Sequence, residues 1–294
     1  MKPLMRFTFP KFLIVAMCGL CAASSGQAAT SAPSLELEVM TFNLRYASER
    51  PPNAWPDRRP AVAAVIAESA PDIFGTQEGV WQQIQNIAED RPEYDWVGLG
   101  RDGGSRGEFC AIYFLRERFE LVAFDHFWLS DTPEIIASIT WGHKHKRMAT
   151  WGHFRDRDTQ REFIVLNTHF DHRIEVARQK SARLIRERIK QFEPDIPLIV
   201  MGDFNCPADA SEPFDILTTE TGLVDTWTHA KTCHPTPTPN TFGGYEPPKF
   251  EGKRIDWVLA RNPTTISRAR IVTTEINGQY PSDHYPVTAT LIFD

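Results

Sequence analysis

The sequence predicts an α/β fold in which two β-sheets pack face to face and helices cover their outer sides. Short runs of apolar, β-branched and aromatic residues recur along the whole chain, so strands dominate. Segments with apolar residues at helical spacing separate these runs at several points. The composition, 41% hydrophobic and 24% charged, is that of an ordinary globular protein with a sizeable core.

The strands are read from apolar runs that end at turn-forming residues. The run at 197–201 is entirely apolar, which is typical of a strand buried on both faces. A charged turn over 155–161 joins two strands as a hairpin, and the glycine-rich stretch 100–105 is also read as a hairpin loop. The predicted strands are 35–44, 73–76, 96–99, 109–114, 119–129, 148–154, 163–166, 197–201, 254–259, 268–274 and 287–292.

Three helices are expected between these strands. One covers 61–69, where Val62, Val65 and Ile66 lie on one face, and a second runs from Glu78 to Glu89. The clearest covers 174–192, whose apolar residues form a single stripe opposite a face rich in arginine and lysine. Acidic residues interleave with those basic ones, which favours a solvated face over a nucleic-acid reader.

The first residues have the pattern of a secretory signal peptide over 1–28. Lys2, Arg6 and Lys11 precede an uncharged, mostly apolar run over 12–23, and Gly26 and Ala28 then match a cleavage site. Because a bilayer span needs about 20 apolar residues, we expect no stable membrane span, although an uncleaved or lipid anchor remains an alternative. We therefore expect export to the periplasm or outside the cell, with 29–294 as one domain.

Charge and cysteine content limit the classes of function. The net charge of −6 lacks the basic excess of proteins that track along nucleic acid, which disfavours tight duplex binding without excluding a nuclease. The expected mature chain retains Cys110, Cys206 and Cys233, so at most one disulfide can form and no cysteine pair suits zinc. We expect a monomer that depends on its hydrophobic core.

Six short segments carry the residue types that hydrolysis of a phosphate ester needs. Each lies at the end of a predicted strand, and strand ends in a layered fold can meet at one edge. A divalent cation offsets the charge of a phosphate ester, and Mg²⁺ prefers oxygen ligands. The segments are 41–45, 76–78, 167–169, 202–205, 255–257 and 282–284.

Metal ligands are expected among the acids and amides of these segments. Glu78, Asn43 and Asp283 are candidate ligands, although Glu78 alone would also suit the start of a helix, where the dipole favours an acid. Asp203 is the candidate base for the attacking water, and Asn205, two residues on in an extended segment, would face the same way. The alternative for this pair is a capped turn.

Two histidines and an arginine complete the candidate site. Asp256 would accept a hydrogen bond from His284 and so raise the pKa of His284. A charged His284 would then stabilise the transition state. His169 would do the same from the other side, although a single histidine at a strand end is more often structural. Arg147 ends the basic run 143–147 and would donate to phosphate, or the run would be a solvated hairpin.

At these residues the chain resembles the endonuclease/exonuclease/phosphatase superfamily, whose members include DNase I-like nucleases. The most specific matches are Gly202 to Asn205 and Ser282 to His284. The resemblance implies a four-layer α/β sandwich of two mixed, mainly antiparallel sheets, and it assigns the roles proposed above. It also places Arg45 where abasic-site enzymes have an acid, so a second metal is less expected and Arg45 would contact substrate.

Together these observations predict an exported, Mg²⁺- or Mn²⁺-dependent phosphoester hydrolase, resembling secreted bacterial members of the superfamily. The first expectation is a phosphodiesterase or nuclease acting on nucleic acid or nucleotides. The alternative within the class is an enzyme for a lipid, inositol or sugar phosphate. A non-catalytic binding protein on the same scaffold is a third reading, disfavoured because none of the site residues is missing.

Overall fold

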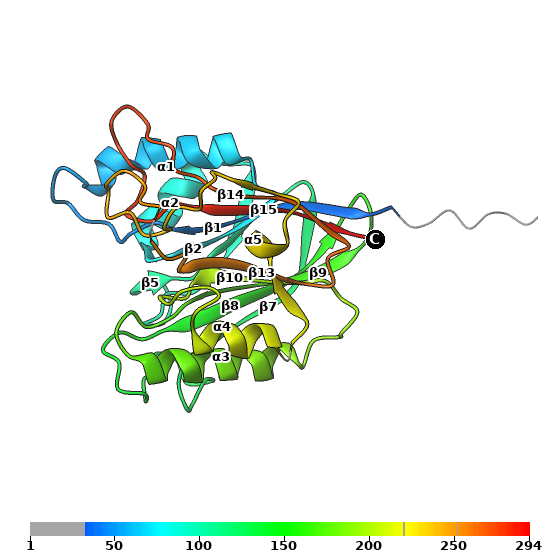
Figure 1. Ribbon diagram of the computed structural model, residues 1–294. Helices are drawn as coiled ribbons and strands as arrows, with labels where there is room; N and C mark the ends of the chain where they lie inside the picture. Colours follow the sequence, from blue (N-terminus) through cyan, green and yellow to red (C-terminus); the bar gives the residue numbers. More distant parts are fainter. Residues whose placement is uncertain (1–32, 220, 251) are drawn as a thin grey trace, which may run out of the picture. The chain divides into compact units, whose positions relative to one another are not determined.

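Two β-sheets pack face to face, with helices on the outer side of each (Figure 1). The computed structural model describes residues 33–219, 221–250 and 252–294, and the predicted leader lies outside them. Among these residues no helix is both long and apolar enough to cross a membrane. The helices are α1 (Trp55–Ser69), α2 (Trp81–Asp90), α3 (Glu175–Ile189), α4 (Glu212–Thr219) and α5 (Thr226–His229).

The first sheet has seven strands and brings both ends of the described chain together. β1 pairs in parallel with β2 and antiparallel with the last strand, β15, and most other pairings are antiparallel. In spatial order its strands are β12 (Thr232–His234), β14 (Thr265–Ile271), β15 (Val287–Phe293), β1 (Leu35–Asn43), β2 (Ile73–Gln77), β6 (Ile112–Leu115) and β4 (Tyr94–Val97).

The second sheet has six strands, with β10 and β9 parallel at its centre. In order they are β11 (Leu223–Asp225), β13 (Asp256–Arg261), β10 (Leu198–Asp203), β9 (Glu162–His169), β8 (Met148–Asp156) and β7 (Phe119–Trp128). A small third sheet pairs β3 (Gly79–Val80) with β5 (Glu108–Phe109).

Three apolar clusters hold these layers together. Inward-facing residues of both sheets, such as Val39, Val165 and Met201, form the core between them. Residues of α1 and α2 pack on the outer face of the first sheet, and α3 and α4 pack on that of the second. Successive residues of a strand point to opposite faces of its sheet, so each sheet packs on the other sheet with one face and on helices with the other. The predicted four-layer sandwich with mixed sheets is confirmed.

Local boundaries differ from the expectation at several points. The helix expected over 61–69 is longer than predicted: α1 already begins at Trp55, because a proline in the first turn of a helix loses no hydrogen bond. α2 begins at Trp81, three residues after Glu78. The short elements α4, α5, β11 and β12 were not predicted, since their apolar patterns are too brief to show a period.

A buried amide links the two sheets behind the site. Asn167 of β9 donates hydrogen bonds to the carbonyls of Thr76 and Ala111, both at 2.9 Å, and accepts one from Gln77 Nε2 at 2.7 Å. A Cβ at position 75 would lie 2.6 Å from Asn167 Cγ, so the close approach requires Gly75. These bonds fix the relative position of the two sheets at their functional edge.

Replacing Asn167 with alanine should lower the free energy of unfolding by about 3 kcal/mol, because buried partners in the first sheet would lose their hydrogen bonds. Urea unfolding measures the change. The control is Gln82→Ala, which removes an exposed amide on α2 and should change stability by no more than about 0.5 kcal/mol. Equal effects of the two substitutions would contradict the link.

Candidate active site

The site lies where strand ends of both sheets meet. β10 pairs with β9 and β13, so Asp203 has His169 and Asp256 as its direct neighbours in register. From the opposite sheet, Asn43 ends β1 and Glu78 follows β2. Residues that are far apart in the sequence therefore form a single cluster, because each of these segments ends or begins a strand at the same edge.

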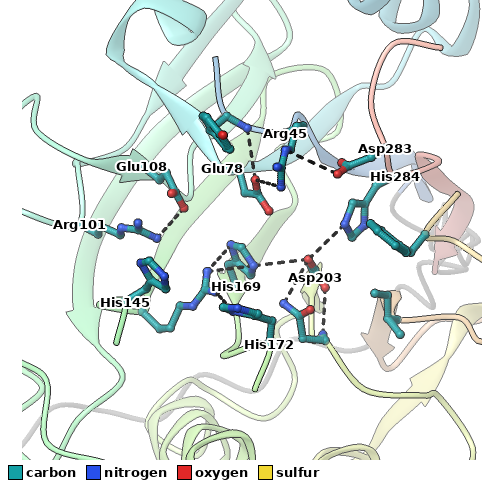
Figure 2. Close-up of a pocket in the computed structure, with 15 residues that line it drawn as sticks. Arg45, Glu78, Arg101, Glu108, His145, His169, His172, Asp203, Asp283 and His284 are labelled. Atoms are coloured by element: carbon teal, nitrogen blue, oxygen red, sulfur yellow. Dashed lines mark hydrogen bonds and ion pairs between the residues drawn. The ribbon is translucent and has the colours of Figure 1, made fainter. Parts of the chain in front are cut away.

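A pocket of about 400 Å³ opens at this edge (Figure 2). Two predicted site residues, Asn43 and Asp256, are buried behind its wall. The other eight predicted residues line it, and they are Arg45, Glu78, Arg147, His169, Asp203, Asn205, Asp283 and His284. The distant segments therefore converge on one cavity, as the sequence predicted.

Asn43 joins carboxylates from the two sheets. Its amide nitrogen donates to Asp203 Oδ2 at 2.9 Å and to Glu78 Oε1 at 3.2 Å. Its amide oxygen accepts the backbone N–H of Arg45 at 2.9 Å. The amide that was expected to offer oxygen to a metal thus faces the carboxylates with its nitrogen in this structure.

Three pocket residues have left-handed backbone conformations. The φ angles are 55° at Arg45, 60° at Glu78 and 51° at Asn205. Such angles are strained for residues other than glycine and are often found at functional sites. They also correct two expectations: Glu78 does not open a helix, and Asn205 does not continue an extended strand but turns back towards Asp203.

Asp203 is suited to act as a base. Its side chain is 1% exposed, and burial together with the neighbouring Asp256 raises the pKa of Asp203 to about 7. Its Oδ1 accepts the backbone N–H of Asn205 at 2.9 Å, and Asn205 Nδ2 lies 3.3 Å from Oδ2. A base that titrates near neutral pH takes a proton from water efficiently.

His284 carries a positive charge at neutral pH. Its Nδ1 lies 3.0 Å from Asp256 Oδ2, which is the predicted pairing. Although burial opposes the charged form, Asp256 and Asp203 raise the pKa of His284 to about 10. The opposite ring nitrogen, Nε2, lies 3.8 Å from Asp203 Oδ2 and faces the pocket.

His169 was expected to be charged like His284, but it is neutral. Burial and then the charge of Arg147 lower the pKa of His169 well below its usual range. Arg147 Nη1 lies 2.8 Å from His169 Nδ1 and its Nη2 lies 3.2 Å from His172 Nδ1. His169 therefore acts as a neutral hydrogen-bonding group, and Arg147 supplies the charge on this side of the pocket.

The donor set fits a divalent cation. Carboxylate oxygens of Glu78 and Asp203 lie within 4.8 Å of each other and of a ring nitrogen of His284, which as an imidazolium is not itself a ligand. Asp283 adds a further carboxylate, and the Arg45 guanidinium lies between it and Glu78, at 3.6 Å and 3.8 Å (Figure 2). This concentration of carboxylate oxygens at a shared pocket matches the preference of Mg²⁺ or Mn²⁺.

A fully buried arginine holds the loops that carry the site. Arg58 donates to the carbonyls of Leu44 and Pro281, both at 2.7 Å, and to those of Arg45 and Tyr46 at 3.2 and 3.3 Å. These carbonyls lie in the segments that follow Asn43 and precede Asp283. Nothing in the sequence pattern distinguishes Arg58, which precedes the helix predicted over 61–69, from an exposed residue, so it was missed.

Replacing Arg58 with methionine should lower the free energy of unfolding by about 3 kcal/mol, because several buried carbonyls would lose charged donors. Thermal or urea denaturation measures this change. Arg59 is the matched control, because the next residue of the same helix forms only partly exposed ion pairs with Glu89 and Asp90. Arg59→Met should cost less than about 1 kcal/mol, and a larger loss than in Arg58→Met would contradict the assignment.

Several pocket residues were not singled out from the sequence. Arg101 comes from the glycine-rich turn and pairs with Glu108 at 2.5 Å, while His172 follows β9. The basic run divides: His145 and Arg147 line the pocket, whereas Lys146 pairs with Asp102 at 2.6 Å. The only feature of the sequence that could have indicated a role for Arg101 is its place as a basic residue inside a glycine-rich turn.

Fold and pocket together define a hydrolase of phosphate esters. Residues 40–284 match the sequence profile of the Endonuclease/Exonuclease/phosphatase family, so the chain belongs to that family. Its members are phosphoester hydrolases. The pairing of Asp203 with Asn205 and of Asp256 with His284 lies inside the matched range, as do Asn43 and Glu78.

Solved structures of similar proteins cover nearly the whole described chain. A family protein from Bacteroides thetaiotaomicron is 32% identical, with a TM-score of 0.83, and the match covers 90% of this chain and 97% of that one. A mannosyl-6-phosphatase from the same organism is also 32% identical, with a TM-score of 0.82, covering 87% and 100%.

A curated relative matches over a shorter range. Protein L388 of Acanthamoeba polyphaga mimivirus is 32% identical over 164 residues, which is 51% of this chain and 59% of the viral protein. The chain therefore spans only part of that relative.

Proposed function

We propose that the protein is an exported, metal-dependent phosphatase that removes a terminal phosphate from a sugar phosphate. The observation that carries the proposal is the single pocket of about 400 Å³ in which Glu78, Asp203 and His284 converge. Small-molecule pockets have volumes of about 300–1,000 Å³, so a small ligand fits this one. The similarity to a mannosyl-6-phosphatase over its whole length supports a sugar phosphate as the substrate.

The metal would be held mainly by Glu78 and Asp283. Asn43, the third expected ligand, faces Glu78 with its amide nitrogen, so it would hold that carboxylate in place. When bound, Mg²⁺ or Mn²⁺ supplies positive charge to the phosphate oxygens and to the leaving oxygen. Four carboxylates line the pocket and provide the negative charge that such an ion needs: Glu78, Glu108, Asp203 and Asp283. Arg45, which lies between Glu78 and Asp283, is then available to a phosphate oxygen.

The side chains of the second sheet supply the remaining chemistry. Asp203 accepts a proton from the attacking water, and Asn205 orients that water or a phosphate oxygen through its amide. The imidazolium of His284, kept charged by Asp256, donates a hydrogen bond to a phosphate oxygen as charge develops. Arg147 lies on the far side of Asp203, next to neutral His169, and offers a second cation to the phosphate.

A phosphodiesterase or nuclease, which the sequence alone favoured, is the second candidate. Tyr46 and Phe242 line the pocket and are 42% and 48% exposed, so either ring is placed to stack on a base. The acidic net charge of −6 does not suit a long nucleic acid. We therefore rank this activity below the phosphatase.

Export to the periplasm or outside the cell is part of the proposal and rests on the pattern of the first 28 residues. Intact-mass measurement of the protein recovered from its host tests it. Cleavage after Ala28 or Ala29 is the expected result, and an intact N-terminus would contradict export by this route.

Purified protein with Mg²⁺ or Mn²⁺ should release inorganic phosphate from mannose 6-phosphate, and EDTA should abolish the release. Asp203→Asn should lower kcat by about 10³-fold, because the water loses its base. Asp215→Asn, an exposed acid on α4, is the control and should retain full activity. Phosphate release by a colorimetric assay provides the measurement.

The same protein should cleave bis-p-nitrophenyl phosphate and oligonucleotides far more slowly. Faster cleavage of either diester than of mannose 6-phosphate would reverse the ranking in favour of the second candidate. No metal-dependent cleavage of any of these esters would contradict the enzymatic assignment altogether.

A further inference from the structure

A second pocket adjoins the catalytic one. It has a volume of about 430 Å³ and shares two lining residues, His145 and His172, with the catalytic pocket. The two imidazole rings lie 5.8 Å apart between their centroids. The cavity that holds the reacting phosphate therefore continues past this histidine pair into a further recess beside the start of α3.

The second pocket is lined by cations that have no acidic partner. Lys144 and Arg173 are exposed, and within the described ranges neither forms an ion pair with a carboxylate. Arg173 only donates through Nε to His172 Nε2 at 3.1 Å. Two other basic side chains near the pockets do have acidic partners: Lys146 pairs with Asp102 and Arg178 with Glu175.

Among the described residues, Asp171 is the only acid that lines the second pocket, and it is already engaged. Asp171 is 2% exposed, and its Oδ1 accepts the backbone N–H groups of Arg173 at 2.9 Å and of Ile174 at 2.7 Å. Its Oδ2 lies 3.9 Å from Arg147 Nε. The carboxylate therefore fixes the loop and faces Arg147, leaving Lys144 and Arg173 without a counter-charge.

A chain of nitrogen contacts connects the recess to the catalytic centre. Arg147 reaches His169 on one side and His172 on the other, and His172 in turn contacts Arg173. Figure 2 shows His145 and His172 on the side of the pocket away from Asp283. Nearby, His143 is 6% exposed and neither of its ring nitrogens has a hydrogen-bond partner in the structure.

We propose that this second pocket is a subsite for a second anionic group of the substrate, a phosphate or a carboxylate distant from the phosphate that is removed. Lys144 and Arg173 would pair with that group, while the His145–His172 pair would lie along the linking segment. The inference rests on the proposed phosphatase function. It defines the substrate class as a phosphorylated glycan that bears a further acidic substituent.

A series of synthetic substrates tests the subsite directly. Alkanediol bisphosphates and ω-carboxyalkyl phosphates of increasing chain length present a distal anion beside the phosphate that is cleaved, and the matching alkyl monophosphates do not. Either phosphate of a bisphosphate can be cleaved, so its rate is divided by two before comparison. At one favoured length the distal anion should raise kcat/KM about tenfold over the monophosphate, because charge-assisted pairs form at the second pocket. The two series distinguish a distal phosphate from a distal carboxylate.

The double variant Lys144→Ala/Arg173→Ala should reduce that ratio to about one. The matched control, Arg157→Ala/Lys231→Ala, removes the same charge from exposed positions outside both pockets, and it should leave the ratio unchanged. The ratio is the readout because it cancels any general loss of activity.

Hydrolysis of the monophosphates with no advantage from a distal anion at any length would overturn the subsite while leaving the phosphatase assignment intact. An advantage that survives in the double variant, or that the control also loses, would likewise overturn it. Failure to hydrolyse the monophosphates at all would instead contradict the proposed function.

Discussion

The amide of Asn43 lies between Asp203 of one sheet and Glu78 of the other, and the rest of the site depends on this bridge. Two carboxylates that approach each other in a buried place repel, so something must hold them together. A neutral amide that donates to both does so without adding charge. Behind it, Asn167 makes a second bridge between the sheets, which fixes the approach of the two strand edges.

The same constraint determines the charges around the pocket. Burial raises the pKa of Asp203, and Asp256, its neighbour in the adjacent strand, raises it further. The two carboxylates together keep His284 protonated. Arg45 balances the carboxylates of the first sheet. The left-handed residues and the buried Arg58 serve this arrangement, because loops that carry close like charges need independent restraint. In the proposed function a divalent cation would complete this balance of charge.

The sequence was sufficient for the fold class and for most of the pocket, because the strand runs and the polar residues that end them are local patterns. It could not show that His169 is neutral, since that depends on the burial of His169 and on Arg147, which lies 22 residues away. It also missed Arg58 and the second pocket, whose roles arise from contacts between separate loops. The start of α1 was misplaced because its prolines read as a turn, although one of them suits a helix start.

The most direct test of the central claim is Mn²⁺ binding followed by electron paramagnetic resonance. The account predicts that the wild-type protein binds Mn²⁺ at this site and that Glu78→Gln, from one sheet, weakens the binding by at least about tenfold. Asp215→Asn should bind as the wild type does. If Glu78→Gln bound the ion as tightly as the wild type, Glu78 would not hold a cation in this pocket, and the account would be contradicted.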